Sequence, residues 1–286
     1  MKLLIIDKPA KLDIKYSTIR VDLQKIPLHL LETIMLIGTH QLDSNFITKV
    51  NSNDITILLF DKSFKNSSII TPTKGKNSEL KLSQYRAVAD KKRAINIAKY
   101  IIQSKITYHI KHLREHNIEV SFNYQHIDQA DKLETLLGIE GSFANIYFKH
   151  YFSLLPKVLH KSKRTKRPPL DPVNALLSLY YTLFYNIATI KLLSFGFEPS
   201  IGFLHKPFRS HNALSSDIVE FIRADINEFV YTLFQNKIVT TEDFTKKNGV
   251  FLKYQPRKRL WVKFQMFQNQ ISPKIDSFIA NIRSLL

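Results

Sequence analysis

Hydrophobic and polar positions follow one pattern in residues 1–71 and another in the rest of the chain. The first part contains short runs rich in Ile, Leu, Val and Thr, a composition typical of β-strands. We expect strands at Leu3 to Ile6, Ser17 to Val21, Ile55 to Phe60 and Ser68 to Thr71, with room for a helix at Pro27 to Ile37. This part of the sequence therefore predicts a small β-rich domain.

From Pro72 to Ser78 the composition changes to Pro, Thr, Lys, Gly, Asn and Ser, which is typical of a connection. Helical periodicity follows it. The helices are expected at Leu82 to His116, Ile127 to Leu155, Pro172 to Phe195, Ser215 to Gln235, and from Leu260 to the end. The sequence thus predicts an α+β protein with an N-terminal β domain at 1–71, a linker at 72–80 and a larger all-helical domain at 81–286.

One stretch, 172–190, has no charged residue and is long enough to be a candidate membrane span. Its polar residues Asn174, Ser178, Thr182 and Asn186 recur every four positions, so they form one stripe along an otherwise apolar helix. Hydrogen-bonding side chains in such a stripe need polar partners. The pattern therefore favours a helix buried in protein over a helix in lipid.

The chain of 286 residues has 42 Lys and Arg against 24 Asp and Glu, a formal net charge of +18, and no cysteine. Without cysteine it has no disulfide, no thiolate zinc or iron–sulfur site and no cysteine nucleophile, which fits a reducing compartment. The first apolar run is interrupted at Asp7, too early for a signal peptide. We therefore expect a cytoplasmic protein.

Positive charge is concentrated in the helical part, because residues 1–80 carry +3 and the remainder carries +15. Two basic clusters comprise Lys157, Lys161, Lys163, Arg164, Lys166 and Arg167, and Lys253, Arg257, Lys258, Arg259 and Lys263. A single basic run is usually a solvated loop. A whole domain of one sign instead matches a polyanion, and nucleic acid fits better than an anionic membrane because no helix has a clean basic face.

Common active-site signatures are absent from the sequence. It contains no G-x-G-x-x-G, G-x-x-x-x-G-K-[ST], G-x-S-x-G or H-E-x-x-H segment, so nucleotide-binding loops, a nucleophile elbow and a zincin site lack support. RNA-recognition, KH and zinc-finger signatures are absent as well. Metal-assisted phosphate chemistry stays open, which directs attention to the few acids in apolar or glycine-containing segments.

Two candidate residues lie beside glycines. Glu140 is close to Gly138 and Gly141, where a ligand could approach closely because its neighbours lack side chains. Taken alone, it is more often a carboxylate that complements the dipole at the start of a helix. His205 follows Gly202 in an apolar segment, and a lone histidine of this kind is more often structural than functional.

Asp217 and Glu220 lie three residues apart on the amphipathic stretch 215–229, so they share one helical face. An isolated pair is more commonly an acidic first turn or a solvated face. Together with Glu140 and His205, however, the pair supplies oxygen ligands and one imidazole, which suit Mg²⁺ or Mn²⁺, the nitrogen favouring Mn²⁺. Such an ion polarises a phosphodiester and helps to activate a hydroxyl nucleophile.

Five blocks, in order and spread over most of the chain, carry a resemblance to a known family. They are Gln84-Tyr85-Arg86 with the helix to Lys105-Ile106, Gly138-Ile139-Glu140-Gly141 leading to Tyr147-Phe148, Arg167 to Ser178, Gly196 to His205, and Asp217 to Arg223. The sequence resembles the CRISPR-associated integrase/endonuclease family, the catalytic subunit of the spacer-acquisition complex. Ser215 and Ser216 replace the usual small apolar pair, and Asn227 stands where an Asp is common.

The resemblance implies a homodimer built partly through the β domains and a helical catalytic domain. It implies that Glu140, His205 and Glu220 bind one divalent ion, Mg²⁺ or Mn²⁺, and that Asp217 assists catalysis. The implied reaction is attack of the 3′-hydroxyl of a short captured DNA on a phosphodiester at each end of a CRISPR repeat, with nuclease activity as its reversal or hydrolysis. The implied partner is a small ferredoxin-like protein whose dimer bridges two integrase dimers.

Charge and proximity predict which residues contact DNA. The candidates are Lys163, Arg164, Lys166, Arg167, Lys206, Arg209, Arg257 and Arg259, with His211 as a further phosphate contact. Two other classes of protein remain as alternatives. One is a non-catalytic nucleic-acid-binding scaffold with the same fold, which the presence of all four site residues disfavours. The other is a membrane-associated basic protein, for which the uncharged stretch 172–190 is the only support.

Overall fold

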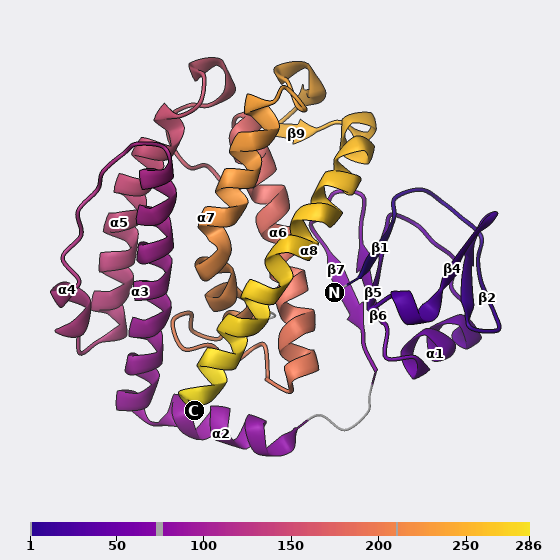
Figure 1. Cartoon of the computed structure of the whole chain (residues 1–286), viewed down its shortest axis with the longest axis horizontal. Helices are drawn as coiled ribbons and strands as arrows, with labels where there is room; N and C mark the ends of the chain where they lie inside the picture. The colour runs from indigo at the N-terminus through magenta and orange to yellow at the C-terminus, as the bar shows by residue number, and fades with distance from the viewer. Residues whose placement is uncertain (1, 73–76, 210) are drawn as a thin grey trace. The chain divides into compact units, whose positions relative to one another are not determined.

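The structure, a computed structural model, describes residues 2–72, 77–209 and 211–286. It divides into two compact units, the first made of Met1–Lys76 and Lys258–Pro273, the second of Asn77–Arg257 and Lys274–Leu286. Strands come first in the chain and a mainly helical region follows, so the predicted α+β class is confirmed (Figure 1). Of the expected linker at 72–80, residues 73–76 lie outside the described residues, and the next helix begins at Ser78.

Two small sheets form the first unit. In the larger sheet the strand order is β1-β5-β6-β7, with β1, β5 and β6 parallel and β7 antiparallel to β6; the other sheet is an antiparallel β2-β3-β4 meander. The strands are β1 (Leu3–Ile6), β2 (Leu12–Lys15), β3 (Thr18–Val21), β4 (Gln24–Pro27), β5 (Thr33–Ile37), β6 (Thr56–Phe60) and β7 (Ser67–Ile70). Parallel neighbours need a crossover, and α1 (Ser44–Ser52), capped by the Asp43 side chain, supplies it between β5 and β6.

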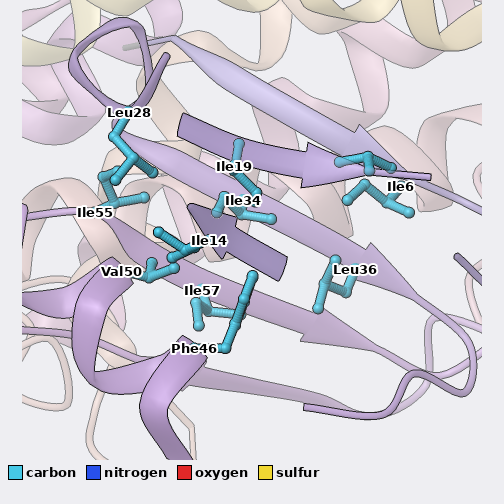
Figure 2. Close-up of a cluster of buried hydrophobic side chains, with 11 residues drawn as sticks. Ile6, Ile14, Ile19, Leu28, Ile34, Leu36, Phe46, Val50, Ile55 and Ile57 are labelled. Carbon is cyan, nitrogen blue, oxygen red and sulfur yellow. The ribbon is translucent and has the colours of Figure 1, made fainter. Parts of the chain in front are cut away.

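The hydrophobic core of this unit lies between the strands and α1 (Figure 2). Phe46 and Val50, four residues apart on α1, belong to the same buried cluster as Ile34 and Leu36 of β5. The whole cluster comprises Ile6, Ile14, Ile19, Val21, Leu28, Ile34, Leu36, Phe46, Val50, Ile55 and Ile57. Trp261, which belongs to this unit, donates from Nε1 to Asp7 Oδ2 at 2.7 Å.

The sequence left room for a helix at Pro27 to Ile37, but the structure has none there. The segment ends β4, makes one short 3₁₀ turn at Leu28–Leu30 and then forms β5. All five residues of β5 are buried, because the strand lies between β1 and β6. A strand covered on both faces has no alternation of polar and apolar residues, so its sequence pattern cannot be told from that of a buried helix.

Long helices dominate the second unit. They are α2 (Ser78–Ala89), α3 (Lys91–Glu115), α4 (Gln125–Asp128), α5 (Leu133–Ser153), α6 (Pro172–Phe195), α7 (Ala213–Gln235) and the end of α8 (Tyr254–Ser284), with 3₁₀ turns at Lys157–Leu159 and Thr241–Asp243 and a hairpin of β8 (Phe244–Lys246) and β9 (Val250–Leu252). Contacts place α3 between α5 and α7, and α6 on the other side of α7 (Figure 1). This row of helices carries the site described below.

The expected helix from Leu82 to His116 is two helices. The break falls at Asp90, whose side chain accepts hydrogen bonds from Lys92 N (3.0 Å) and Arg93 N (3.1 Å). Aspartate at this position satisfies backbone donors that the first turn of a helix leaves unpaired. Asp90 therefore ends α2 and begins α3.

The uncharged stretch 172–190 lies in α6, which is long and apolar enough to cross a membrane by length and composition alone; 67% of its most apolar window is buried in protein. Its stripe residue Asn174 is fully buried and donates to Lys163 O at 2.9 Å and to Asp171 Oδ2 at 2.7 Å. As predicted, α6 is a core helix whose polar stripe is used for hydrogen bonds within the protein.

The last part of α8 packs against the helices of the second unit. Phe278 stacks on Phe221 of α7 with ring centroids 3.9 Å apart, and on Tyr100 of α3 at 5.5 Å. Lys274 Nζ lies 2.7 Å from Asp225 Oδ2 of α7. The C-terminal end of the chain, for which the sequence indicated no function, thus covers the two helices that carry part of the site.

Candidate active site

Three elements of the second unit bring the predicted site residues together. Glu140 lies on α5, His205 in the loop after α6, and Asp217 and Glu220 on α7. Helix α3 adds Lys105, whose Nζ contacts Glu140 Oε1 and lies 2.6 Å from Glu220 Oε2. One ammonium group therefore joins the two carboxylates that were predicted to bind metal.

This pair of carboxylates is largely withdrawn from solvent. The side chains of Lys105 and Glu220 are 2% and 4% exposed, and that of Glu140 is 22% exposed. Arg223 gives Glu220 a second partner, with Nη2 2.7 Å from Oε1. Burial alone would raise the pKa of the Glu220 carboxyl, but the charges of Arg223 and Lys105 outweigh it and hold that pKa well below its usual range. Glu220 is therefore ionised at neutral pH.

Arg223 is itself fixed by an aromatic ring and a buried hydrogen-bond chain. Its guanidinium carbon lies 4.9 Å from the centre of the Tyr181 ring. The Tyr181 hydroxyl donates to Asn227 Oδ1 at 2.5 Å, and Asn227 Nδ2 donates to the Tyr147 hydroxyl at 2.9 Å. An aspartate at 227 has no amide hydrogen to donate, so this chain of contacts depends on the asparagine that sets the sequence apart from the family pattern.

Asp217 organises the loop that carries His205. Its Oδ2 accepts from Phe203 N at 2.7 Å and Leu204 N at 3.1 Å, and its Oδ1 accepts from His205 N at 3.0 Å. His205 Nδ1 lies 2.7 Å from the same Oδ1. Because an ionised carboxylate only accepts hydrogen bonds, Nδ1 carries the hydrogen and the lone pair of the neutral ring is on Nε2.

The close wrapping of this loop around Asp217 requires glycine at position 202. A Cβ atom on Gly202 would lie 2.8 Å from His205 O and 2.9 Å from both Ala213 C and Asp217 Oδ2. Two of these atoms are backbone atoms that cannot move aside independently. Gly202 therefore permits the approach of the loop to the start of α7.

Gln84 of α2 holds the chain just before this loop. Its fully buried side chain donates from Nε2 to Glu198 O at 3.0 Å and to Ile201 O at 2.7 Å, and its Oε1 accepts from Glu198 N at 2.8 Å. The three bonds fix both ends of a four-residue segment. Gln84 thus supports the position of His205 without touching it.

Two opposing effects determine the protonation of His205. Burial disfavours the imidazolium, but the hydrogen bond and negative charge of Asp217, together with Glu220, raise the pKa of His205 above its ordinary value. His211 behaves in the opposite way: burial and the neighbouring His205 lower its pKa. Its Nε2 is 3.0 Å from the Ser216 hydroxyl, so this predicted phosphate contact is already engaged within the protein.

The residues present fit a divalent cation. The position between Glu140 and Glu220 accommodates a positive charge, the ammonium of Lys105. His205 lies near enough to Glu220 for each group to shift the pKa of the other, and its Nε2 is the ring nitrogen not committed to Asp217. Two carboxylates and one imidazole form a donor set suited to Mg²⁺ or Mn²⁺.

Most of the predicted DNA contacts lie on the surface. The exposed residues are Lys163, Lys166, Arg167, Lys206, Arg209 and Arg259. Arg164 instead donates to Asn174 Oδ1 at 2.8 Å and to Ser178 Oγ at 3.1 Å, and Arg257 is only 8% exposed. The guanidinium groups of Arg164 and Arg257 are thus turned into the protein, and we leave both out of the DNA contacts proposed below.

Sequence reasoning did not assign roles to Lys105, Arg223 or Gln84. All three were inside blocks that carried the family resemblance, which was the available signal. Periodicity alone places Lys105 on a helix and predicts a solvated lysine, because a buried lysine is rare unless it is paired. Its partners lie 35 and 115 residues further along the chain, and only the fold brings them to it.

The fold and the site define an α+β protein whose basic helical unit holds two carboxylates around one lysine ammonium, beside an oriented imidazole. The chain belongs to the Cas1 family: the family model described as CRISPR associated protein Cas1 matches residues 3–266. CRISPR-associated endonuclease Cas1 1 of Thermodesulfovibrio yellowstonii is 30% identical over 264 residues, which cover 86% of this chain and 82% of that protein.

Solved structures agree with this assignment. A Cas1 protein from Thermotoga maritima matches with a TM-score of 0.90 and 19% identity, covering 99% of this chain and 96% of that one. A casposase bound to integration product matches with a TM-score of 0.85 and 20% identity, covering 99% and 91%. A chain of a Cas6-RT-Cas1–Cas2 complex matches at 0.76 and 25% identity, covering 93% of this chain and 32% of that one. The first two similarities establish the fold.

Proposed function

We propose that the protein is a divalent-metal-dependent DNA integrase and endonuclease of CRISPR adaptation. It joins the 3′-hydroxyl of a short captured DNA to a phosphodiester at each end of a CRISPR repeat, and hydrolysis or reversal of the same step gives nuclease activity. One observation carries the proposal: Glu140 and Glu220 converge on the ammonium group of Lys105, with His205 oriented by Asp217, in a chain of the Cas1 family.

Each site residue has a distinct part in this proposal. Glu140, Glu220 and His205 Nε2 would hold Mg²⁺ or Mn²⁺, and the bound ion supplies a Lewis acid at the scissile phosphodiester. Asp217 keeps the hydrogen on His205 Nδ1, so that Nε2 is free to act as a ligand. Lys105 neutralises the two carboxylates, which means that its ammonium and the ion compete for one position.

The surface charge supports DNA as the substrate. The chain carries +18, and exposed Lys163, Lys166, Arg167 and Arg209 lie in the helical unit that contains the site. Side chains of this kind neutralise phosphates and position a duplex without reading its sequence. Lys206 is paired with Glu134 at 2.7 Å and would exchange that partner for a phosphate.

The proposed assembly is a homodimer formed partly through the N-terminal β domain. A small ferredoxin-like partner bridges two such dimers. This part of the proposal is supported by the structural similarity to a chain of a complex that contains Cas1 and Cas2. A protein that inserts DNA into a chromosomal array works in the cytoplasm.

Strand transfer tests the function directly. A labelled short duplex with free 3′-hydroxyls is incubated with supercoiled plasmid and the bridging partner in Mn²⁺, Mg²⁺ or EDTA. We expect metal-dependent joining by the parent and a loss of at least about 1,000-fold in Glu140→Gln and His205→Ala, since metal-ion charge stabilisation contributes several kcal/mol. DNA affinity, measured by fluorescence anisotropy, should stay within about threefold of the parent because phosphate contacts elsewhere dominate it.

Glu119→Gln is the matched control, because this carboxylate lies in the same unit, is exposed and pairs with Arg114, away from the proposed site and DNA contacts. It should join DNA like the parent. A parent protein that binds DNA but neither joins nor cuts it with any metal would overturn the proposal in favour of the non-catalytic scaffold.

A further inference from the structure

Three side chains that can bind metal lie together in the second unit, away from the candidate active site. His112 and His116 are one turn apart on α3, and Glu228 faces them from α7, which packs along α3 (Figure 1). His112 Nε2 and His116 Nε2 are 3.0 Å and 2.7 Å from the same oxygen, Glu228 Oε2. Glu228 follows Glu220 by two turns, about 12 Å of helix, so the cluster shares no ligand with the active site.

We propose that His112, His116 and Glu228 form a second cation site, which binds a zinc-type transition metal ion. Their ligand atoms lie within 4.8 Å of one another. Bond lengths of about 2.0–2.2 Å put two ligands of a tetrahedral Zn²⁺ about 3.3 Å apart, so a pair at the 4.8 Å limit would close by about 1.5 Å, or about 0.75 Å for each ligand. Two imidazoles and a carboxylate favour Zn²⁺ over Mg²⁺ or Ca²⁺.

Neighbouring groups hold the ligands in orientations that suit an ion. His112 Nε2 faces the Glu228 carboxylate and carries the ring hydrogen, while Nδ1 lies 3.0 Å from the Tyr147 hydroxyl. An ion bound at Nε2 would shift that hydrogen to Nδ1, where the Tyr147 oxygen can accept it. The Thr232 hydroxyl donates to Glu228 Oε1 at 3.3 Å, which leaves Oε2 toward the histidines. Metal-bound histidines and carboxylates are commonly oriented by a second hydrogen bond of this kind.

The site is accessible to solvent from one side. His112 is buried, His116 is partly buried, and the side chain of Glu228 is 40% exposed, so an ion can enter from the Glu228 side. Three protein ligands leave the fourth tetrahedral position to water.

The sequence around these histidines reads His112-Leu113-Arg114-Glu115-His116, the H-x-x-E-H order of one class of zinc peptidases. In those enzymes the glutamate acts on bound water. Here the Glu115 side chain is 57% exposed, lies 3.9 Å from Lys111 Nζ and is not one of the three converging ligands. Glu115 is therefore not placed to act on water bound to the proposed ion, which ties α3, the helix that carries Lys105, to α7, the helix that carries Glu220.

The test uses the full chain without a histidine tag, in a Glu140→Gln, His205→Ala background that disables the proposed catalytic metal site. Zn²⁺ binding is measured by isothermal titration calorimetry, and Co²⁺ binding by visible absorption. We expect one Zn²⁺ per chain, a higher midpoint of thermal unfolding with Zn²⁺, and the visible bands of Co²⁺ with fewer than six ligands. Because neither readout of metal binding involves strand transfer, the outcome is independent of the proposed integrase function.

His116→Gln and Glu228→Gln, made in the same background, each remove one ligand. They should weaken Zn²⁺ binding by more than the roughly 10- to 100-fold that loss of a supporting hydrogen bond causes. His126→Gln, which changes an exposed histidine of α4, should bind like the background. Zn²⁺ affinity that is the same with and without His116, or no stoichiometric Zn²⁺ and Co²⁺ binding at all, would show that the cluster is only a histidine–glutamate ion-pair network.

Discussion

Asp217→Asn separates the two tasks of the Asp217 carboxylate, to hold the loop and to orient the imidazole. The substitution keeps the shape of the side chain but turns one of its two oxygens into an amide nitrogen. In the parent each oxygen accepts two hydrogen bonds, Oδ2 from Phe203 N and Leu204 N, and Oδ1 from His205 N and Nδ1. Whichever oxygen is replaced, the new amide faces two donors of the loop and can accept from neither.

The magnitude follows from these four bonds. A hydrogen bond to a charged group contributes about 1.5–3 kcal/mol, so losing two costs about 3–6 kcal/mol, out of the roughly 5–15 kcal/mol by which folded domains are stable. The cost is smaller if the amide nitrogen takes the Oδ1 position and donates to His205 Nδ1. In that arrangement the ring hydrogen moves to Nε2, which removes the lone pair needed for a cation.

Urea unfolding followed by circular dichroism measures the first effect, and strand joining at saturating Mn²⁺ measures the second. We expect the free energy of unfolding to fall by at least about 1.5 kcal/mol and joining to fall by about 100-fold, the upper end of what loss of an orienting hydrogen bond causes at metal sites. Asp225→Asn is the control on the same helix. Its partner is Lys274 at 2.7 Å, a partly exposed pair that contributes about 1 kcal/mol or less.

An Asp217→Asn protein that unfolds at the urea concentration of the parent would show that the loop does not depend on the carboxylate. If it also joined DNA at the parent rate, the assignment of Asp217 as the residue that orients His205 would be refuted.

Three further predictions concern the same site. Lys105→Met should bind Mn²⁺ about tenfold more tightly or better by calorimetry, because an ammonium 2.6 Å from Glu220 Oε2 no longer competes; unchanged affinity would contradict that competition. At subsaturating Mn²⁺, DNA joining should fall as the pH is lowered through the pKa of His205, which lies above its ordinary value of 6.5. The reason is that an imidazolium has no lone pair with which to bind a cation. Joining that stays constant from pH 6 to 8.5 would exclude His205 as a metal ligand. In thermal unfolding, Gly202→Ala should lower the free energy of unfolding by about 1–3 kcal/mol through overpacking. Gly141→Ala, with nothing within 4 Å of the new Cβ, should raise it by about 0.5–1 kcal/mol by stabilising α5. The reverse order would show that close packing at Gly202 is unimportant.

Elements whose ends carry capping or turn residues could be predicted from the sequence. Buried elements without such residues at their ends could not. The predicted bounds of α6 match because Asp171 caps its start, Pro172 occupies the first turn and Gly196 ends it with a φ of 94°. Strand β5 lacks such signals and is apolar on both faces. The sequence also could not predict that residues 258–273 belong to the first unit. They are part of one continuous amphipathic helix, and its pattern does not show which residues pack in which unit.

The site shows a similar division. The spacing of Asp217 and Glu220 predicts that both lie on one helical face, and they do lie in one site. It does not predict that Asp217 points to a loop while Glu220 meets Lys105 and Arg223. Spacing along a helix determines the face on which each side chain lies. It does not determine which residue that side chain meets, because the partner comes from a segment far away in the chain.

The four hydrogen bonds of Asp217 also determine which substitutions would remove the proposed activity alone and which would disturb the fold as well. Glu140 lies inside α5 and contacts the Lys105 side chain, so we expect a neutral replacement there to remove one proposed ligand and leave the backbone in place. Loss of Asp217 or Gly202 disturbs the backbone itself. In homologous proteins no longer selected for activity, we therefore expect Glu140 to be substituted first. Asp217 and Gly202 should be retained for as long as the fold is needed.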